Sequence, residues 1–219
     1  CAMLEIKIGL RDMDKRFRAE GWAGRQPGTS LHHEEIRNRT VGIIGYGHIG
    51  KEIAKRAAAF DMRIIAIRRS QQDAVAPLDW IGTADQLDKL LSESDFVVVA
   101  CDMNEETVGM IDAPQIAKMK PSGIIINVAR GRIIAEEALY SALKNKKIGG
   151  AVLDVWYNYI GNDREEVSPS NLPFKQLDNV ILSAHESASA PEQVERRWKF
   201  VAENICRATE GETAKNIVF

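Results

Sequence analysis

The sequence predicts a doubly wound α/β domain of the Rossmann type, with a parallel sheet and with helices flanking it at both ends of the chain. From Thr40 onward, short apolar runs alternate with segments of helical periodicity. The runs are apolar on consecutive residues, as in strands that are buried on both faces of a parallel sheet. A glycine-rich turn, 45–50, also joins the first run to the first helical segment, as in folds that bind dinucleotides.

The elements follow in order along the chain. An opening helix over 1–21 carries apolar residues at helical spacing and stops at Gly21, and a polar loop follows it. The expected strands are 40–45, 62–67, 95–100, 123–128, 149–155 and 179–184, with helices over 49–60, 84–92, 113–119 and 136–145. A closing helix runs from just after residue 190 to about 209. We therefore expect three parts: helix and loop 1–30, dinucleotide-binding domain 31–189, and helix and tail 190–219.

The composition narrows the classes of partner. The chain has 29 Lys and Arg against 31 Asp and Glu, a net charge of −2 without a basic block, so nucleic acid is not expected as a partner. Cys1, Cys101 and Cys206 form neither a metal-type spacing nor a disulfide framework, which favours a reducing, cytoplasmic setting. No apolar run is long enough to span a bilayer. We expect no metal site and no membrane contact.

The turn after the first predicted strand is G-x-G-x-x-G. Gly45 permits the tight turn, Gly47 lets the backbone approach a pyrophosphate, and Gly50 lets the helix pack on the strand. The amides of His48 and Ile49 then face the phosphates at a helix N-terminus, where the helix dipole favours anions. The alternative is a tight turn without a ligand, but the strand–turn–helix–strand context favours a dinucleotide.

Arg68, Arg69 and Ser70 follow the second predicted strand, where such folds usually place an acid that holds the ribose hydroxyls. Guanidinium groups cannot accept those hydrogen bonds, but they form forked, charge-assisted bonds with a 2′-phosphate. The hydroxyl of Ser70 adds another donor. These residues predict NADP(H) as the cofactor, with NAD as the other choice. The alternative is that both arginines are solvated and that the site is indifferent to the phosphate.

Three chemically capable side chains follow later strands, at the sheet edge where open α/β folds bind ligands. Arg130 either forks onto a substrate carboxylate and polarises its carbonyl group, or belongs to a structural ion pair. Asp154 either meets a nicotinamide amide or caps a turn. His185 is the only histidine at a strand end, and imidazole exchanges protons near neutral pH. His32 and His33 lie in a polar loop and are interpreted as surface residues.

Four segments, in this order and spacing, carry a specific resemblance. They are "VGIIGYGHIG" (41–50), "INVARG" (126–131), "GGAVLDVW" (149–156) and "LDNVILSAH" (177–185). The sequence resembles the D-isomer-specific 2-hydroxyacid dehydrogenases, which include glyoxylate/hydroxypyruvate reductases, phosphoglycerate dehydrogenases and formate dehydrogenases. The match runs through nearly the whole chain.

The resemblance implies roles for individual residues. Arg130 would bind the carboxylate and carbonyl of a 2-oxo acid, and His185 would be the general acid/base. The residues implied to lie by the cofactor are Asp102, Thr107, Val128 and Asp154. The opening helix resembles the dimerisation helix of the family, so we expect a homodimer.

The sequence departs from the family pattern after the fifth predicted strand. Tyr159 stands where the family orients its histidine with a Glu, and a neutral phenol cannot raise the pKa of an imidazole as a carboxylate does. Glu165 and Glu166 in the next loop are either substitutes for that Glu or solvated charges. Family members also carry a substrate domain of roughly one hundred residues ahead of the opening helix. We therefore interpret the chain as the cofactor-binding part of a longer enzyme, whose last residues return to that domain.

Two functions are consistent with these features. The first is an NADP-dependent reductase of a small 2-oxo acid, such as glyoxylate or hydroxypyruvate. The second is a non-catalytic dinucleotide-sensing module, like the corepressors that share this fold. Arg130 and His185 favour the first, whereas Tyr159 and the absence of a substrate domain from the sequence favour the second.

Overall fold

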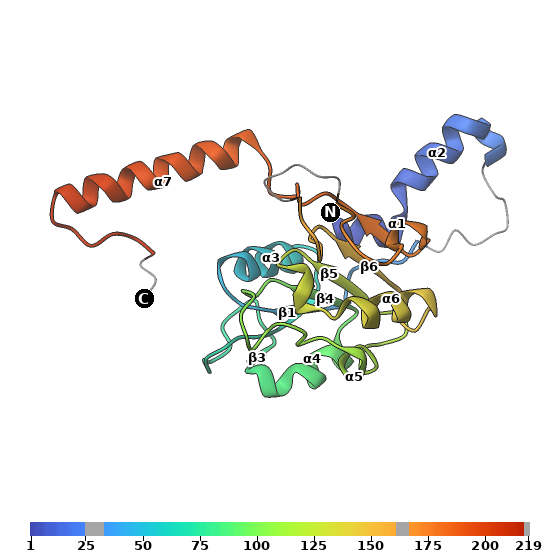
Figure 1. Cartoon of the computed structure of the whole chain (residues 1–219), viewed down its shortest axis with the longest axis horizontal. Coiled ribbons are helices and arrows are strands. Elements are labelled where there is room, and N and C mark those ends of the chain that lie inside the picture. Colours follow the sequence, from blue (N-terminus) through green and yellow to red (C-terminus); the bar gives the residue numbers. More distant parts are fainter. Residues whose placement is uncertain (25–32, 161–166, 217–219) are drawn as a thin grey trace. The chain divides into compact units, whose positions relative to one another are not determined.

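The computed structural model describes residues 1–24, 33–160 and 167–216. The chain divides into two compact units, Cys1–Ser183 and Ala184–Phe219, which are described separately. The first unit holds a seven-stranded sheet with helices packed on it, and the described part of the second holds the long helix α7 (Pro191–Thr209) (Figure 1).

The sheet of the first unit is entirely parallel. Its strands lie in the order β3-β2-β1-β4-β5-β6-β7. The bounds are β1 (Thr40–Ile44), β2 (Arg63–Ile67), β3 (Trp80–Gly82), β4 (Phe96–Val99), β5 (Ile124–Asn127), β6 (Gly150–Leu153) and β7 (Val180–Leu182). The order reverses between β1 and β4, which makes that position the topological switch point of the sheet. The predicted fold class is confirmed.

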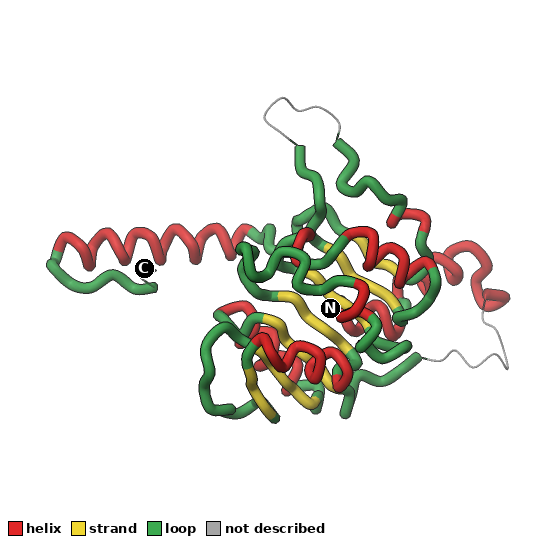
Figure 2. The backbone as a smooth tube through the Cα atoms, turned by 60° about the horizontal axis from the view of Figure 1, so that its bottom comes forward, coloured by secondary structure: helices red, strands yellow, loops and turns green. Residues whose placement is uncertain are grey.

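Helices cover both faces of the sheet, because alternate strand residues point to opposite sides (Figure 2). Ile44 and Val97 belong to the cluster that packs against α4 (Leu87–Glu93), α5 (Ala113–Ile116) and α6 (Glu136–Lys144). Ile43 and Val98 belong to a second cluster, which packs against α1 (Ala2–Ile8) and α3 (His48–Ala58). Two apolar layers therefore cover the two faces of the sheet, and the loops that follow the strands lie at its carboxyl edge.

The opening segment differs from the prediction, because it is two helices and not one. Gly9 takes a left-handed conformation, with φ 67° and ψ 39°, and it ends α1 and begins α2 (Leu10–Glu20). The side chain of Ile6 on α1 lies against the amino end of β6, near Gly150. Gly21 ends α2 as expected and is followed by the short 3-10 helix η1 (Gly21–Gly24).

Smaller differences concern short elements. Strand β3 was not predicted, and the segment expected as a helix over 84–92 begins as a 3-10 turn, η2 (Ala84–Gln86), before α4. The helix expected over 113–119 is only α5, four residues long. Two further 3-10 turns, η3 (Gly131–Ile133) and η4 (Phe174–Gln176), precede α6 and β7. The remaining helices and strands lie within two residues of their predicted bounds, and α7 confirms the closing helix.

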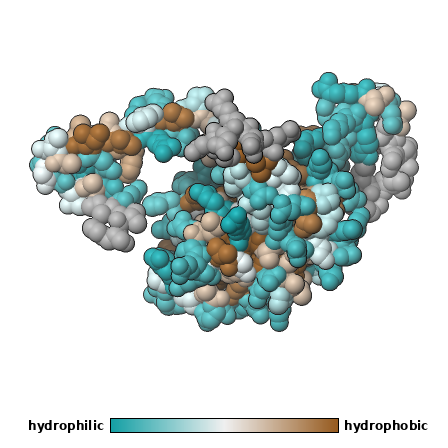
Figure 3. Space-filling model, viewed as in Figure 1, coloured by the Kyte–Doolittle hydropathy of each residue, from teal (hydrophilic) through white to brown (hydrophobic). Residues whose placement is uncertain are grey.

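The surface of the first unit that faces the viewer in Figure 3 is mainly hydrophilic, with scattered hydrophobic side chains. None of the described helices combines the length and the apolar character needed to cross a bilayer.

Candidate functional site

The glycine-rich turn lies at the switch point, where β1 and β4 end. Gly45 has a φ of 100°, and a Cβ atom there would lie 2.5 Å from the backbone nitrogen of Cys101. A Cβ atom on Gly50 would lie 2.3 Å from the carbonyl oxygen of Gly45. Both positions therefore require glycine, since the turn packs backbone against backbone. The sequence roles assigned to these two glycines match the local geometry.

Gly47 is different, because no atom of the described residues explains its lack of a side chain. It is the N-cap of α3, with φ −87° and ψ −156°, and within the described part of the chain no heavy atom lies within 4 Å of the Cβ atom it would carry. An L-residue tolerates this backbone, so the open space in front of Gly47 is the feature that a bound pyrophosphate would fill. The exposed residues His48 and Ile49 begin α3, where the first amides have no carbonyl partner within the helix. The turn therefore fits the diphosphate of a dinucleotide.

The residues after β2 lie at the same carboxyl edge. Arg68 is half-buried, its amide donates to the carbonyl oxygen of Gly82 at 3.0 Å, and its guanidinium donates to the side chain of Gln72. Arg69 and Ser70 are exposed. A guanidinium has five N–H donors, so the bond to Gln72 orients Arg68 without exhausting its capacity to bind a phosphate.

The loop after β4 is closed by its own hydrogen bonds. The hydroxyl of Thr107 donates to the carbonyl oxygen of Asp102 at 2.8 Å and accepts from the amide of Asn104, also at 2.8 Å. The two residues expected near the cofactor therefore belong to one compact turn. Burial raises the pKa of the neighbouring Cys101 to about 11, so this thiol is protonated and a poor nucleophile at neutral pH.

A buried amide holds the loop that carries Arg130. Asn127, at the end of β5, is 1% exposed. Its Oδ1 accepts from the amide of Ala129 at 3.0 Å, and its Nδ2 donates to the carbonyl oxygen of Arg130 at 2.9 Å. Arg130 is an exposed residue, and its guanidinium donates to the carbonyl oxygen of Ala129 at 2.7 Å. Within the described ranges, no carboxylate forms a salt bridge with it. The amide of the half-buried Val128 continues the ladder to Val99.

The next two loops are joined to each other. A Cβ atom on Gly131 would lie 2.2 Å from the carbonyl oxygen of Trp156, so the loops after β5 and β6 touch backbone to backbone. Asp154 directly follows β6 and is 5% exposed, and its Oδ1 accepts from the hydroxyl of Ser183 at 2.6 Å. The indole of Trp156 donates to the carbonyl oxygen of Ser183 at 2.8 Å.

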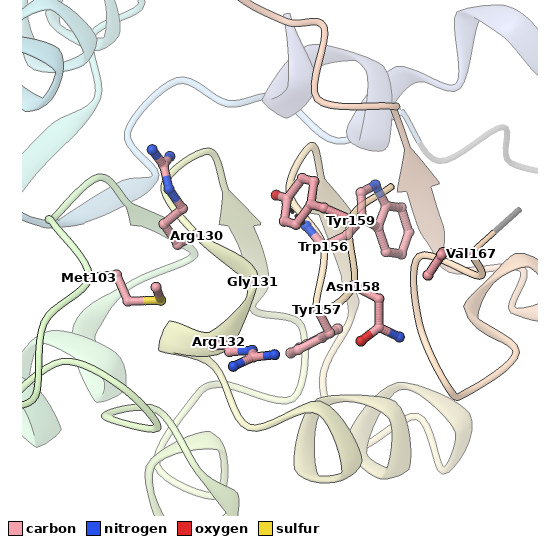
Figure 4. A pocket seen from close by; sticks show the side chains of 9 residues that line it. All are labelled: Met103, Arg130, Gly131, Arg132, Trp156, Tyr157, Asn158, Tyr159 and Val167. Atoms are coloured by element: carbon pink, nitrogen blue, oxygen red, sulfur yellow. Dashed lines mark hydrogen bonds between the residues drawn. The ribbon is translucent and has the colours of Figure 1, made fainter. Parts of the chain in front are cut away.

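A cavity of about 520 Å³ opens between the loops that follow β4, β5 and β6 (Figure 4). Arg130 and Arg132 line it, and no Asp or Glu does so in the described part of the chain. The side chains of Trp156 and Tyr159 lie together on the side of the cavity opposite Met103 (Figure 4). The cavity is lined by Met103, Arg130, Gly131, Arg132, Trp156, Tyr157, Asn158, Tyr159 and Val167.

Tyr159 occupies an exposed position in this wall. Its hydroxyl oxygen accepts a hydrogen bond from the amide of Trp156 at 3.1 Å, which closes a short turn. The alternatives to it, Glu165 and Glu166, lie outside the described residues, as does His32.

His185 belongs to the second unit and is described with it. It follows β7 in sequence, is exposed, and has a φ of 60° in the left-handed region, which few residues without glycine's freedom adopt. His33, in contrast, is exposed in the loop before β1, as expected. Across the described ranges, no cluster of three His, Cys, Asp or Glu residues is arranged to hold a metal ion.

Three residues of this edge were not predicted from the sequence: Asn127, Gly131 and Ser183. Each lies within one of the four family-like segments, which was the available signal. The roles of Gly131 and Ser183 depend on which loops touch in space, and the linear order of residues does not reveal that, whereas Asn127 acts within its own loop.

Comparison with known proteins agrees with this geometry. The family model for the NAD-binding domain of D-isomer specific 2-hydroxyacid dehydrogenases matches residues 1–187. A glyoxylate reductase of Korarchaeum cryptofilum (strain OPF8) is 37% identical over 187 residues, which cover 84% of this chain and 53% of that protein. A D-3-phosphoglycerate dehydrogenase of Methanocaldococcus jannaschii is 39% identical over 184 residues, covering 84% of this chain and 34% of that protein.

Solved structures show the same similarity. An acyclic imino acid reductase in complex with NADPH and D-Arg matches with a TM-score of 0.81 at 27% identity, covering 99% of this chain and 64% of that one. The NAD-complexed form of a D-isomer specific 2-hydroxyacid dehydrogenase from Lactobacillus delbrueckii ssp. bulgaricus matches with a TM-score of 0.79 at 26% identity, covering 100% and 66%. The chain spans about half the length of the glyoxylate reductases that it matches. It belongs to the D-isomer specific 2-hydroxyacid dehydrogenase family and comprises the NAD-binding domain of that family.

Proposed function

We propose that this chain is the cofactor-binding part of an NADP-dependent dehydrogenase that interconverts a small 2-oxo acid and its 2-hydroxy acid, with glyoxylate or hydroxypyruvate as the expected 2-oxo acids. One observation carries the proposal. The turn that fits a diphosphate and the pinned, solvent-facing Arg130 lie on the same carboxyl edge of one sheet, beside a cavity lined by two guanidinium groups and no described carboxylate.

In this proposal, each residue of the site has its own role. The amides at the start of α3 hold the diphosphate, and Asp154 orients the nicotinamide amide at the edge of the sheet. The guanidinium of Arg130 binds the carboxylate of the substrate and stabilises negative charge that develops on its carbonyl oxygen. His185 donates a proton to that oxygen in the reductive direction and removes it in the oxidative direction. The nicotinamide cofactor, when bound, supplies or accepts the hydride.

The preference for NADP rests on Arg68. We expect Arg68→Asp to lower the preference for NADPH over NADH by about 10- to 100-fold, because it removes a charge-assisted contact and adds repulsion of the 2′-phosphate. The measurement is the ratio of the two dissociation constants by calorimetry. Arg56→Asp is the control, because it changes the charge equally on an exposed residue in the last turn of α3, at the opposite end of that helix from the phosphate turn. An unchanged ratio for Arg68→Asp would mean that the arginines do not read the phosphate.

A homodimer through α2 is part of the proposal. Leu10 and Phe17 on α2 and Trp22 after it are 62%, 57% and 79% exposed, and the rings of Phe17 and Trp22 meet edge to face. Apolar groups that gather on a surface in this way favour association. Sedimentation is expected to give twice the 24.4 kDa chain mass, and Phe17→Glu is expected to yield the monomer. A monomeric wild-type chain would contradict this assignment.

The three cysteines form no disulfide in the structure, which supports a reducing, cytoplasmic location as part of the proposal.

A dinucleotide-sensing module without catalysis is the second candidate, and Tyr159 at the position of the usual Glu favours it. The test is to supply the full-length protein with NADPH and a panel of 2-oxo acids that includes glyoxylate, and to follow the nicotinamide absorbance. Consumption of NADPH supports the reductase. Tight binding without consumption supports the sensor.

A further inference from the structure

The contacts at the ends of β6 and β7 point to Ser183 as a positioning residue for the nicotinamide end of the cofactor. We propose that Ser183 fixes the carboxylate of Asp154 in the orientation that accepts the nicotinamide amide, and that Trp156 in turn fixes Ser183. This inference rests on the proposed function, because it assigns the side chain that holds Asp154 in place.

The strands bring the pair together. Ala151 to Leu153 of β6 pair with Val180 to Leu182 of β7, so the residues that follow, Asp154 and Ser183, lie side by side at the carboxyl edge. The amide of Ser183 donates to the carbonyl oxygen of Leu153 at 3.0 Å, which extends the ladder by one bond. The register of two short strands therefore decides which side chain faces Asp154.

Ser183 is held at its backbone and at its side chain. Its carbonyl oxygen accepts from the indole nitrogen of Trp156 at 2.8 Å, and its hydroxyl donates to Oδ1 of Asp154 at 2.6 Å. With the backbone fixed at both polar groups, the hydroxyl has only its χ1 rotation left to lose when it binds the carboxylate. The indole contact thus lowers the entropic cost of holding Asp154.

The bond suits the task of an orienting contact. Hydroxyl-to-carboxylate bonds of 2.5–2.7 Å are charge-assisted and about twice as strong as neutral ones. Asp154 is 5% exposed, so water does little to compete for its oxygens. A carboxylate offers about four acceptor positions, so one hydroxyl restricts the rotation of the group and does not by itself fill it. An amide N–H of the nicotinamide then binds to a carboxylate that is already oriented. The binding of the cofactor therefore does not include the entropic cost of ordering that carboxylate.

Binding measurements on the chain itself test this role. We expect Ser183→Ala to weaken NADPH binding about tenfold, the value of one hydrogen bond to a charged group. The same variant should bind 2′-phospho-ADP-ribose, which is the cofactor without its nicotinamide ring, within twofold of wild type. Ser183→Thr keeps a hydroxyl and should restore NADPH binding. Trp156→Phe keeps Ser183 but removes the indole N–H, and it should weaken NADPH selectively by about threefold. The pair NADH and ADP-ribose repeats the comparison without the 2′-phosphate.

The difference between the two ligands separates positioning from folding. An equal loss for NADPH and for 2′-phospho-ADP-ribose, or no loss for NADPH, would overturn the role of Ser183 while the proposed function stands. Failure of the wild-type chain to bind any of the four nucleotides would instead overturn the proposed function, and this inference with it.

Discussion

His185→Gln in the full-length protein is expected to lower the turnover of 2-oxo acid reduction by a factor of about 10² to 10⁴, the range for loss of a proton-transfer group. Glutamine keeps a hydrogen-bonding side chain of similar size but cannot exchange a proton near neutral pH. Steady-state kinetics at saturating NADPH measures the effect. The dissociation constant of NADPH should change far less than turnover, because we propose that its phosphates bind at the start of α3.

His33→Gln is the matched control for that experiment. His33 is exposed in the loop before β1, so the same substitution there should leave turnover unchanged. A loss smaller than tenfold for His185→Gln would assign His185 to structure, and its left-handed backbone, with φ 60°, would then be its main feature.

Gly47→Ala is expected to weaken dinucleotide binding by more than about 100-fold and to leave the stability of the fold nearly unchanged. The backbone of Gly47 suits alanine, and no heavy atom of the described residues lies within 4 Å of the added methyl group. The cost in unfolding free energy is therefore on the order of 1 kcal/mol or less, as for an N-cap exchanged for Ala. The methyl group would occupy the space that the pyrophosphate needs. Calorimetry measures the binding, and urea denaturation measures the stability.

Two further variants frame this result. His48→Ala removes an exposed side chain but keeps the backbone amide at the start of α3, so binding should stay within about threefold. Gly50→Ala places a methyl group 2.3 Å from the carbonyl oxygen of Gly45 and should destabilise the fold itself. Normal binding by Gly47→Ala would show that no diphosphate approaches this turn.

Much of the fold could be predicted from the sequence, because parallel strands that are buried on both faces have continuous runs of apolar residues. The break between α1 and α2 at Gly9 could not be predicted. A glycine inside a helix lowers the stability of the helix by only about 1 kcal/mol relative to alanine, and the apolar pattern does not reveal the φ angle of that glycine. Strand β3 has only two apolar side chains, Trp80 and Ile81, before Gly82, so it lacks the longer apolar run that marks the equally short β7.

The residues of the candidate site also fall into those that the sequence indicates and those that it does not. Gly45, Gly50 and Arg130 were proposed from the sequence because each lies in a turn that follows an apolar run expected as a strand. The bond from Ser183 to Asp154 was not, because it joins residues 29 positions apart and depends on the pairing of β6 with β7. Asn127 was overlooked for a different reason, since its partners are backbone groups of its own loop and no sequence pattern marks that contact.

The absence of room for a side chain at Gly131 has a mechanical consequence. Because the backbone at Gly131 contacts the backbone at Trp156, there is no free space between the segments that bear Arg130 and Asp154. This edge of the sheet would then move as one rigid body, and the distance between the two side chains to which we assign the substrate carboxylate and the nicotinamide amide would stay constant.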